Sequence, residues 1–485
     1  MRTSSDNQGN GLREAQIKCE AGESRISKLA ILSLVLGILS LLFFVLAGIP
    51  AIVIGIISVV RVRRSRGQLK GKSIALAGVL VSIPFMCVFF LLWSLDAPPI
   101  PNDYTVADLR SAPAEYAESF EILKTLIDED WRLPGTPAIG LTKGDVDIID
   151  EIHGVMTEGT SAEISETLGY YAKNVEQAWT RTKKARGAIS QLNAFAEIAD
   201  LTGPSAHVRI MRVSNLVELA HLYQAYAHLQ TEQGDIHAFT TELIELDSVL
   251  RKFSLNARLL IAKLVCHLAM ADGIVTANAI ANNPEASRET VELLARHFTP
   301  LTAEQISLRN SVLFEYLFTK DIINKGIGQS AIGKTPLLKR NSTMRLYRNI
   351  YDDRINNLED IETATSARLS VWPPIYPGME PVTFQVREPL PLLYRCYNPV
   401  GSRFIRMARS HRKSNGRTIL MVQDDLLQIV LSKRLGRDVS LKARAYSDEY
   451  IVDVENRKIF SPGPDGKIDT RDDISLRINP QVLGW

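Results

Sequence analysis

The chain has 485 residues, too many for one ordinary domain, so we expect a membrane segment and two soluble units. Residues 1–95 hold eleven Lys and Arg against four Asp and Glu, whereas the remaining residues hold 45 basic and 50 acidic side chains. This mildly acidic body argues against a nucleic-acid binder, whose soluble part should be strongly basic. Four cysteines are too few for a disulfide scaffold, although Cys266 and Cys396 could pair outside the cytoplasm or remain two small buried side chains.

Two long charge-free runs follow an N-terminal tail at 1–28 and predict a membrane anchor at 29–95. The second run, Ser73–Leu95, has the length of one membrane crossing. The first run, Leu29–Val60, is longer than one helix needs and contains the helix-breaking sequence Ala47-Gly-Ile-Pro50. It could form a hairpin of two helices or one long tilted helix.

The loop between the two runs, residues 61–72, contains six cations and no acid: Arg61, Arg63, Arg64, Arg66, Lys70 and Lys72. Short loops rich in Lys and Arg stay in the cytoplasm. One crossing from this loop places everything after Leu95 on the other side. We therefore expect an inner-membrane protein whose large C-terminal part is extracytoplasmic.

The anchor also resembles a small bacterial membrane domain of unknown function. The resemblance rests on Ala30-Ile-Leu-Ser-Leu-Val-Leu-Gly37, on the link Arg63-Arg-Ser-Arg-Gly-Gln-Leu-Lys-Gly71 and on Ile74-Ala-Leu-Ala-Gly78. That family has two apolar stretches joined by a basic R-R-S-x-G loop. The resemblance implies a bacterial membrane protein and no activity.

Residues 96–365 are expected to form an α-helical domain. A heptad pattern runs through Ile164, Leu168, Tyr171, Val175, Ala178, Thr182, Ala185, Ile189, Leu192 and Ala196, which predicts one long helix. Its apolar face could form a dimeric coiled coil, but so few heptads favour a bundle within the chain.

Two further signals define helices in this region. Residues 214–230 and 236–254 have the rhythm of a single tetratricopeptide-like helix pair, and Thr302-Ala-Glu-Gln305 is a capping box that starts a helix through Phe318. The pattern at about 205–350, including Leu337 to Tyr347, resembles the helical region of uncharacterised bacterial envelope proteins, which implies fold and location only.

The sequence Gly328-Gln-Ser-Ala-Ile-Gly-Lys-Thr335 matches the phosphate-binding loop G-x-x-x-x-G-K-[ST]. Such a loop needs a buried strand before it and a helix after it. Here Val312–Lys325 predicts a helix, and Pro336 follows the motif directly. We therefore expect a glycine-rich turn and no bound nucleotide.

The histidines lack a recognised metal-binding spacing. His221 and His228 are seven residues apart on one predicted helix, about 10 Å, which is too far to share an ion without partners from elsewhere. His237 and His267 stand alone in the sequence. Helix-surface or core histidines are the expected interpretation.

A basic stretch lies near the C-terminal module, with no acid between Gly401 and Thr418. Its members are Arg403, Arg406, Arg409, Arg412, Lys413 and Arg417. It could bind anionic lipid head groups, but a solvated face paired with acidic side chains is the favoured interpretation.

The tail combines a hairpin pattern, Tyr450, Val452 and Val454 turning into 458–460, with an acidic loop at 461–474. Its pattern S-x-G-P-D-G-x-x-x-T-x-D-D-I resembles the calcium loop of the major pseudopilins of type II secretion. Carboxylate oxygens are the ligands that Ca²⁺ prefers. The resemblance implies Asp465, Asp472 and Asp473 as calcium ligands, with Asp469 as a further candidate. No prepilin cleavage motif is present at the N-terminus, which puts assembly into a pilus in doubt.

The sequence thus predicts a membrane-anchored, mainly α protein: a helical bundle-like soluble domain at 96–365, a linker at 366–379 and a small α+β module at 380–485. We expect a cell-envelope protein that binds lipid bilayer and other envelope proteins, with a scaffolding role and no catalytic residues or cofactor other than calcium. The alternatives are a secretion-associated component with a calcium-stabilised tail and an extracytoplasmic hydrolase with an unrecognised site.

Overall fold

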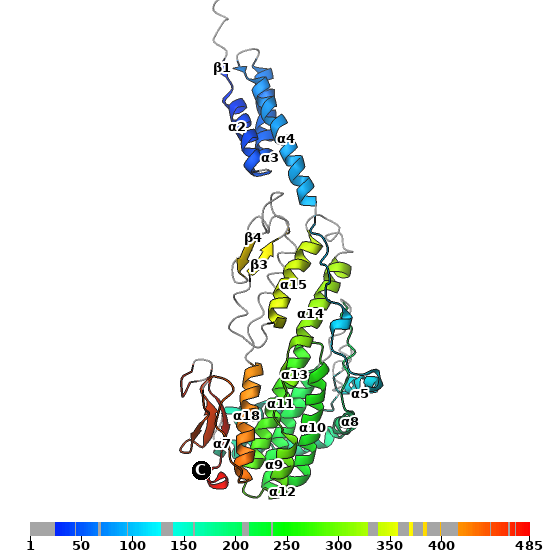
Figure 1. The fold of residues 1–485 in the computed structure, drawn as a ribbon, viewed down its shortest axis with the longest axis vertical. Coiled ribbons are helices and arrows are strands. Elements are labelled where there is room, and N and C mark those ends of the chain that lie inside the picture. Colours follow the sequence, from blue (N-terminus) through cyan, green and yellow to red (C-terminus); the bar gives the residue numbers. More distant parts are fainter. Residues whose placement is uncertain are drawn as a thin grey trace, which may run out of the picture. The chain divides into compact units, whose positions relative to one another are not determined.

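The computed structural model forms two compact units, each of which we describe by itself (Figure 1). The first comprises Met1–Pro98 with the short segments Thr335–Ser342 and Pro391–Gly401, and the second comprises the rest of the chain. The structure describes residues 25–43, 45–65, 69–94, 96–127, 139–158, 161–205, 213–233, 236–327, 338–356, 368–371, 382–385, 398, 416–446, 448–463, 466–470 and 472–485.

The first unit, which we call the anchor, is built on three helices. They are α2 (Lys28–Phe43), α3 (Val45–Arg64) and α4 (Lys72–Ser94), and the short strands β1 (Arg25–Ile26) and β2 (Leu69–Lys70) pair in parallel beside them. The first apolar run is therefore two helices packed on each other rather than one. Pro50 lies inside α3, so the expected helix-breaking segment Ala47–Pro50 does not end this helix.

Where the structure describes side chains of residues 25–94, only small ones are buried. They are Ser27, Ala30, Ser33, Gly37, Ser40, Ala47, Gly48, Ala51, Gly55, Ser58, Ala75, Gly78 and Ser82. A Cβ on Gly78 would come within 2.6 Å of the Ser33 carbonyl group, and one on Gly37 would come within 2.6 Å of the Gly78 oxygen. The Ser33 hydroxyl donates to the Ala51 carbonyl oxygen at 2.9 Å. Close backbone approach through small residues is typical of helices that associate in lipid.

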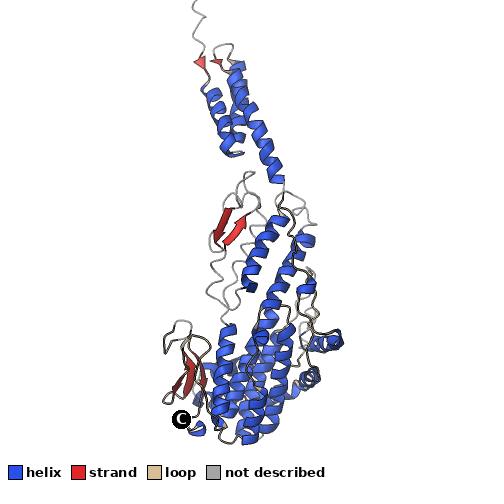
Figure 2. Ribbon diagram, viewed as in Figure 1, coloured by secondary structure: helices blue, strands red, loops and turns tan. Residues whose placement is uncertain are grey.

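The second unit, which we call the body, is mainly helical (Figure 2). Its first half contains η1 (Val106–Asp108), η2 (Ala114–Tyr116), α5 (Ala117–Ile127), α6 (Lys143–Glu158), α7 (Ser161–Arg181), α8 (Lys183–Asn193), α9 (Ser214–Gln233), α10 (Ile236–Asn256) and α11 (Leu260–Ala281). Then follow α12 (Arg288–His297), α13 (Ala303–Ile306), α14 (Arg309–Asp321), a π-helical turn η3 (Ile322–Ile327) and α15 (Arg340–Asn356), which begins in the segment assigned to the anchor.

Helix α11 lies at the centre of the body, where it packs against α9, α10 and α18 (Gly416–Arg434). Among the described residues it is the one helix with both the length and the apolarity needed to cross a membrane, but 61% of its apolar window is buried within the protein. Such burial is typical of a core helix. The apolar helical segments found in the anchor, Lys28–Ser40 and Lys72–Cys87, are shorter.

The predicted heptad helix is interrupted. Thr182 separates α7 from α8, and its hydroxyl donates to the Trp179 carbonyl oxygen at 2.9 Å. The two helices pack against different neighbours: α7 contacts α6 and α9, whereas α8 contacts α5 and α10. Leu168, Val175 and Ile189 are buried, so the apolar face serves an intramolecular bundle. The prediction of one long helix was wrong at Thr182, while the preference for a bundle agrees with this packing.

Two local predictions are confirmed. Helices α9 and α10 occupy the positions expected for the helix pair. The capping box is present, since the Thr302 hydroxyl accepts from the Gln305 amide at 3.2 Å and the Gln305 side chain accepts from the Thr302 amide at 2.9 Å. The helix that it starts is only α13, however, and α14 begins anew at Arg309.

The segment after residue 98 is fixed to two helices of the body through Asp103. Its carboxylate accepts hydrogen bonds from the Tyr316 hydroxyl at 2.6 Å and the Arg348 guanidinium at 3.1 Å, and it pairs with the Lys320 ammonium at 2.7 Å. Burial alone would raise the pKa of Asp103, but Lys320, Tyr316 and Arg348 together lower it. The segment is therefore held by charge-assisted bonds to α14 and α15.

The C-terminal residues form a small sheet of order β5-β6-β7, with β5 Ile451–Asp453, β6 Lys458–Ser461 and β7 Ile474–Arg477, followed by α19 (Pro480–Leu483) (Figure 2). The expected hairpin is confirmed by the antiparallel β5–β6 pairing. The sheet and α18 share one hydrophobic core with the preceding helices, to which Leu426, Val430 and Leu476 contribute. A second hairpin pairs β3 (Arg368–Val371), which falls inside the expected linker 366–379, with β4 (Val382–Gln385).

Candidate functional site: a histidine–aspartate cluster

Three helices of the body bring His153, His221 and Asp272 together. Among the described residues, these are the one group of at least three His, Cys, Asp or Glu side chains whose potential ligand atoms all lie within 4.8 Å of one another. His153 is on α6, His221 on α9 and Asp272 on α11. Because α9 packs against both α6 and α11, the three side chains meet although they are distant in the sequence.

The two imidazole rings are stacked, with centroids 3.7 Å apart and planes inclined by 11°. The Nδ1 atom of His153 lies 2.9 Å from the Gln224 side-chain oxygen, and Nδ1 of His221 lies 3.2 Å from a carboxylate oxygen of Asp150. Each ring thus has an acceptor on its Nδ1 side. Such partners fix the tautomer and the orientation of an imidazole, and they leave Nε2 as the atom suited to a ligand.

Two carboxylates flank His221. Its Nε2 atom lies 3.4 Å from an oxygen of Asp272, opposite the contact with Asp150. Burial would lower the pKa of His221, but the hydrogen bonds and charges of Asp272 and Asp150 outweigh burial and raise it. Among the described residues, neither Asp150 nor Asp272 forms an ion pair with lysine or arginine. The cluster therefore has an excess of negative charge whenever the imidazoles are neutral.

The cluster is partly accessible to solvent. The side chains of His221 and Asp272 are 13% and 15% exposed, and that of Asp150 is 58% exposed. An ion can therefore reach the ligands from solvent, and of the two acceptors on His221 only Asp272 is largely screened from water.

The acidic tail, where calcium was predicted, is only partly described. Asp465 lies outside the described residues. Asp469 pairs with the Lys458 ammonium at 2.9 Å, and its amide donates to the Asp473 carboxylate at 2.9 Å. The Thr470 hydroxyl donates to Asp472 at 2.7 Å. Asp469, Asp472 and Asp473 therefore share one turn without converging on a point, and calcium binding here stays a prediction.

Other predicted features fall partly outside the described residues. The motif at 328–335 does so entirely, as do Arg403, Arg406, Arg409, Arg412 and Lys413 of the basic stretch. Cys396 is likewise not described, while Cys266 is a free thiol whose burial raises its pKa to about 12. The helix predicted before the phosphate-loop motif is confirmed as α14, so the strand that such a loop requires is absent from the described residues before it.

Of the other described histidines, His228 and His267 are largely buried, which agrees with the expected core histidines. Burial lowers the pKa of His228 and of His267 to about 4. His297 lies 2.9 Å from Asp247, which also accepts from Arg251 at 2.6 Å. These buried partners connect α10 with α12.

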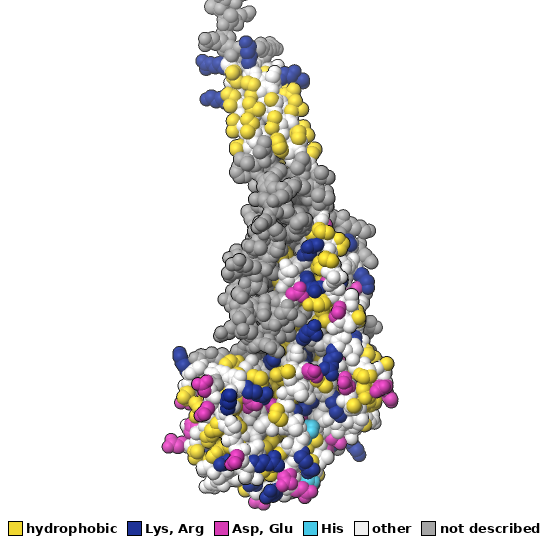
Figure 3. Space-filling model, in the orientation of Figure 1, with side chains coloured by type: hydrophobic (Ala, Val, Ile, Leu, Met, Phe, Trp, Pro, Cys, Tyr) yellow, Lys and Arg dark blue, Asp and Glu magenta, His cyan; other side chains and the backbone are white. Residues whose placement is uncertain are grey.

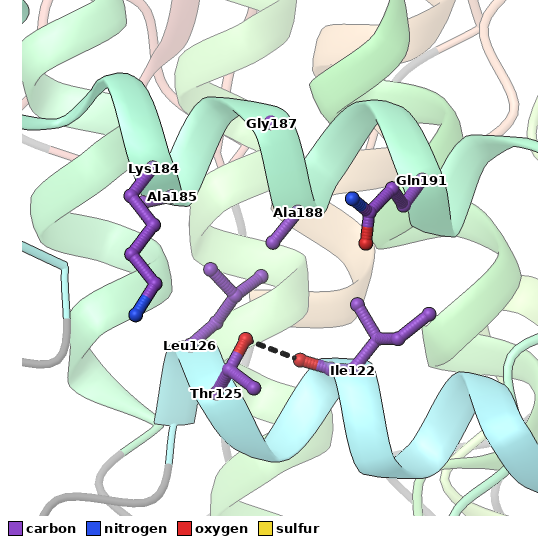
Figure 4. Close-up of a pocket in the computed structure, with 8 residues that line it drawn as sticks. All are labelled: Ile122, Thr125, Leu126, Lys184, Ala185, Gly187, Ala188 and Gln191. Carbon is purple, nitrogen blue, oxygen red and sulfur yellow. Dashed lines mark hydrogen bonds between the residues drawn. The ribbon is translucent and has the colours of Figure 1, made fainter.

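A pocket of about 230 Å³ opens between α5 and α8 (Figure 4). It is lined by Ile122, Thr125, Leu126, Lys184, Ala185, Gly187, Ala188 and Gln191. The Thr125 hydroxyl donates to the Ile122 carbonyl oxygen of its own helix at 2.7 Å. The lining is mostly aliphatic, and Lys184 is its charged member. It offers no acid–base pair, so the His153–His221–Asp272 cluster is the stronger candidate for chemistry.

This cluster was not predicted from the sequence, because His153, His221 and Asp272 lie on three different helices. Two spacings could have indicated it: Asp150 and His153, and His221 and Gln224, are each three residues apart and therefore adjacent on a helix face.

Comparison with known proteins gives one match. The family model described as Domain of unknown function (DUF4190) matches residues 29–92, which confirms the predicted resemblance of the anchor. No curated protein and no solved structure matches the chain. Residues 29–92 are therefore similar to a domain of unknown function, and the match assigns no activity to the body.

Proposed function

We propose that this chain is a membrane-anchored protein of the bacterial cell envelope, with the anchor in the inner membrane and the body on the extracytoplasmic side, where it binds other proteins. The single observation that carries the proposal is the inverted packing of the anchor. The buried described residues of its three helices, and Ser27 before them, are all Gly, Ala or Ser, whereas many large apolar side chains of these helices are exposed.

Fourteen large apolar residues on α2, α3 and α4 are 37–58% exposed: Ile31, Leu32, Val35, Ile38, Leu39, Ile49, Val53, Ile56, Ile57, Val60, Leu76, Leu80, Ile83 and Phe90. They form the apolar band of the anchor in Figure 3. In water this band would exceed the few hundred Å² of contiguous apolar surface that a soluble protein tolerates. Lipid removes this cost, because acyl chains are as apolar as the side chains.

The orientation follows from charge. Arg25, Lys28, Arg61, Arg63, Arg64, Lys70 and Lys72 lie near one end of the helices, where β1 and β2 pair, and Figure 3 shows cations capping the apolar band. Cations of this kind favour the cytoplasmic side. The chain enters the body from the other end of α4, so this arrangement favours an extracytoplasmic body.

Matched acidic substitutions test the anchoring. Ile56 in the anchor and Val106 in the body are 55% and 52% exposed, respectively. If Ile56 faces lipid, Ile56→Asp should impair membrane integration, since an acidic side chain at the centre of a membrane helix costs about 3 kcal/mol. Val106→Asp should integrate like the wild type, as measured by resistance to alkaline extraction. Equal integration of both variants would contradict the proposal.

Reporter fusions test the orientation. A phosphatase that matures only outside the cytoplasm, fused after Trp485 of the full chain, should be active. A reporter that works only in the cytosol should be inactive at the same position. The reverse result would overturn the extracytoplasmic placement while leaving the anchoring itself intact.

The exposed face of α11 supports the protein-binding role. Ile261 and Leu268 lie two turns apart on this helix and are 51% and 58% exposed. Apolar side chains aligned in this way are typical of a surface that contacts an apolar helix face of another protein. A pulldown with the detergent-solubilised chain should lose its partner when Leu268 becomes Ser, but keep it when the equally exposed Ile468 becomes Ser. Identical pulldowns from both variants would contradict this role.

A further inference from the structure

We propose that His153, His221 and Asp272 bind a first-row divalent transition-metal ion of the Zn²⁺ class, with Gln224 and Asp150 orienting the two imidazoles. The inference is independent of the membrane anchoring, because every one of these residues belongs to the body.

Ligand spacing is the first argument. Two ligands of one tetrahedral zinc ion, each about 2.1 Å from the metal, lie about 3.4 Å apart. The Nε2 atom of His221 and the Asp272 oxygen are 3.4 Å apart, and one ligand atom of His153 lies within 4.8 Å of both. A contact of 3.4 Å is long for a hydrogen bond but matches the separation of two ligands on the same ion. Because the two imidazole rings are nearly parallel, His153 must tilt toward Asp272 before both rings can point a nitrogen at one ion.

The outer partners are the second argument. Metal-binding imidazoles nearly always donate their other ring N–H to a carboxylate, carbonyl or water. Here both rings have such an acceptor on Nδ1, namely Gln224 for His153 and Asp150 for His221.

The charge of the site is the third argument. Two carboxylates lie beside the imidazoles, and among the described residues neither pairs with lysine or arginine, which favours a dication. The nitrogen-rich ligand set suits Zn²⁺, Fe²⁺, Ni²⁺ or Cu²⁺ better than Mg²⁺ or Ca²⁺, which prefer oxygen ligands.

Three protein ligands leave a coordination position for water, which is the composition of catalytic rather than structural zinc sites. If the ion binds, the extracytoplasmic hydrolase considered from the sequence gains a specific location, between α6, α9 and α11. The proposal itself concerns binding of the ion.

Equilibrium dialysis of the full-length, detergent-solubilised and chelator-stripped protein against Zn²⁺ tests the proposal. We expect one zinc ion per chain. His221→Gln and Asp272→Asn should each weaken zinc binding by well over tenfold. Asp150→Asn, which changes only a partner of His221, should weaken it by about tenfold. The control is His237→Gln, which removes an exposed histidine bonded to Thr290 on another face and should bind zinc like the wild type.

A spectroscopic measurement covers the case in which a variant loses helix content. Co²⁺ bound to the wild-type protein should show the visible absorption of a site with low coordination number and magnetic coupling to two imidazole nitrogens. Absence of stoichiometric zinc, zinc binding that survives both His221→Gln and Asp272→Asn in folded protein, or cobalt coupled to no imidazole would each overturn the proposal.

Discussion

The anchor and the body use the same apolar residue types in opposite ways. In the anchor, Ser33, Gly37 and Gly78 are buried while Ile56 and Leu80 point outward. In the body the order is reversed, and side chains such as Phe253, Phe314 and Tyr316 are fully buried. The difference shows that helicity and apolar content alone do not tell whether a helix is suited to a protein core or to a membrane. The size of the buried residues is what distinguishes the two regions.

Helix α11 illustrates this lesson. It is apolar enough to cross a membrane, yet Phe253 and other large side chains of neighbouring helices belong to the same core. Helix α4 has similar apolarity but packs through Ala75, Gly78 and Ser82. The experiments below test this contrast between the two regions and the burial of charged groups in the body.

The largest effect is expected from truncating equivalent apolar side chains in the two regions. Phe253→Ala should lower the free energy of unfolding of the body by about 3–5 kcal/mol, because it leaves a cavity in a packed core. Leu80→Ala, at a 58% exposed position of the anchor, should change stability by less than about 0.5 kcal/mol. Chemical denaturation of the detergent-solubilised chain measures both. A comparable loss for Leu80→Ala would mean that this residue packs against protein rather than lipid.

Mild acid should destabilise the body through His267. Burial, aided by the nearby charges of Lys263 and Arg417, lowers its pKa from 6.5 to about 4, and a hydrogen bond with the Gln305 carbonyl oxygen acts in the opposite direction. Because the unfolded chain binds the proton more readily, the contribution of His267 is complete above pH 6.5. It is lost as the pH falls toward 4, by roughly 3 kcal/mol in total. His267→Gln should therefore make the urea midpoint less sensitive to pH over this range.

The buried carboxyl group of Asp424 should affect the acid sensitivity of the body in the opposite direction. Burial raises its pKa to about 6, so the folded chain takes up this proton first as the pH falls from 6 to about 4. Asp424→Asn should consequently make the body more sensitive to acid than the wild type. If His267→Gln and Asp424→Asn shift the pH dependence in the same direction, this account of the buried groups is wrong.

The same glycine substitution should have opposite effects in the two regions. Gly78→Ala places a Cβ 2.6 Å from the Ser33 backbone and should destabilise the anchor by about 1–3 kcal/mol. Gly169→Ala, on α7 with nothing within 4 Å of the new Cβ, should stabilise the body by up to about 1 kcal/mol. Thermal unfolding in detergent reports both signs. Tolerance of alanine at Gly78 would argue against close helix packing in the anchor.

The smallest effect is expected at the acidic tail. Calcium at ten times its dissociation constant should stabilise the body by about 1.4 kcal/mol and leave the anchor unchanged. Asp472→Asn should remove this response, whereas Glu455→Gln, in the neighbouring hairpin, should keep it. A melting temperature that does not respond to millimolar calcium would remove calcium from the list of ligands.

Local patterns in the sequence were sufficient for much of the fold. The charge-free runs located the anchor helices, and the capping box at Thr302 was correct because its hydrogen bonds join residues three apart. The interruption at Thr182 was not predictable from the heptad pattern. The apolar face of the heptad pattern stays buried on both sides of Thr182. The pattern alone therefore does not show that α7 ends there and α8 begins.

The candidate site could not be predicted from local sequence patterns. His153, His221 and Asp272 belong to three helices whose contacts depend on the packing of the whole body. Isolated spacings such as Asp150 with His153 indicate a shared helix face but not what lies opposite. The candidate site therefore depends on long-range packing, whereas the helix positions depend on neighbours in the sequence.

Asp103 gives the body a defined mechanical attachment. Any tension that reaches residue 99 from a tethered N-terminal segment passes within a few residues to Lys320, Tyr316 and Arg348. The load is therefore transferred to α14 and α15 through ionic contacts before it can act on the cluster between α6, α9 and α11. In a pulling experiment, the contacts of Asp103 with α14 and α15 should break first. Helices α6, α9 and α11 should bear load only after that.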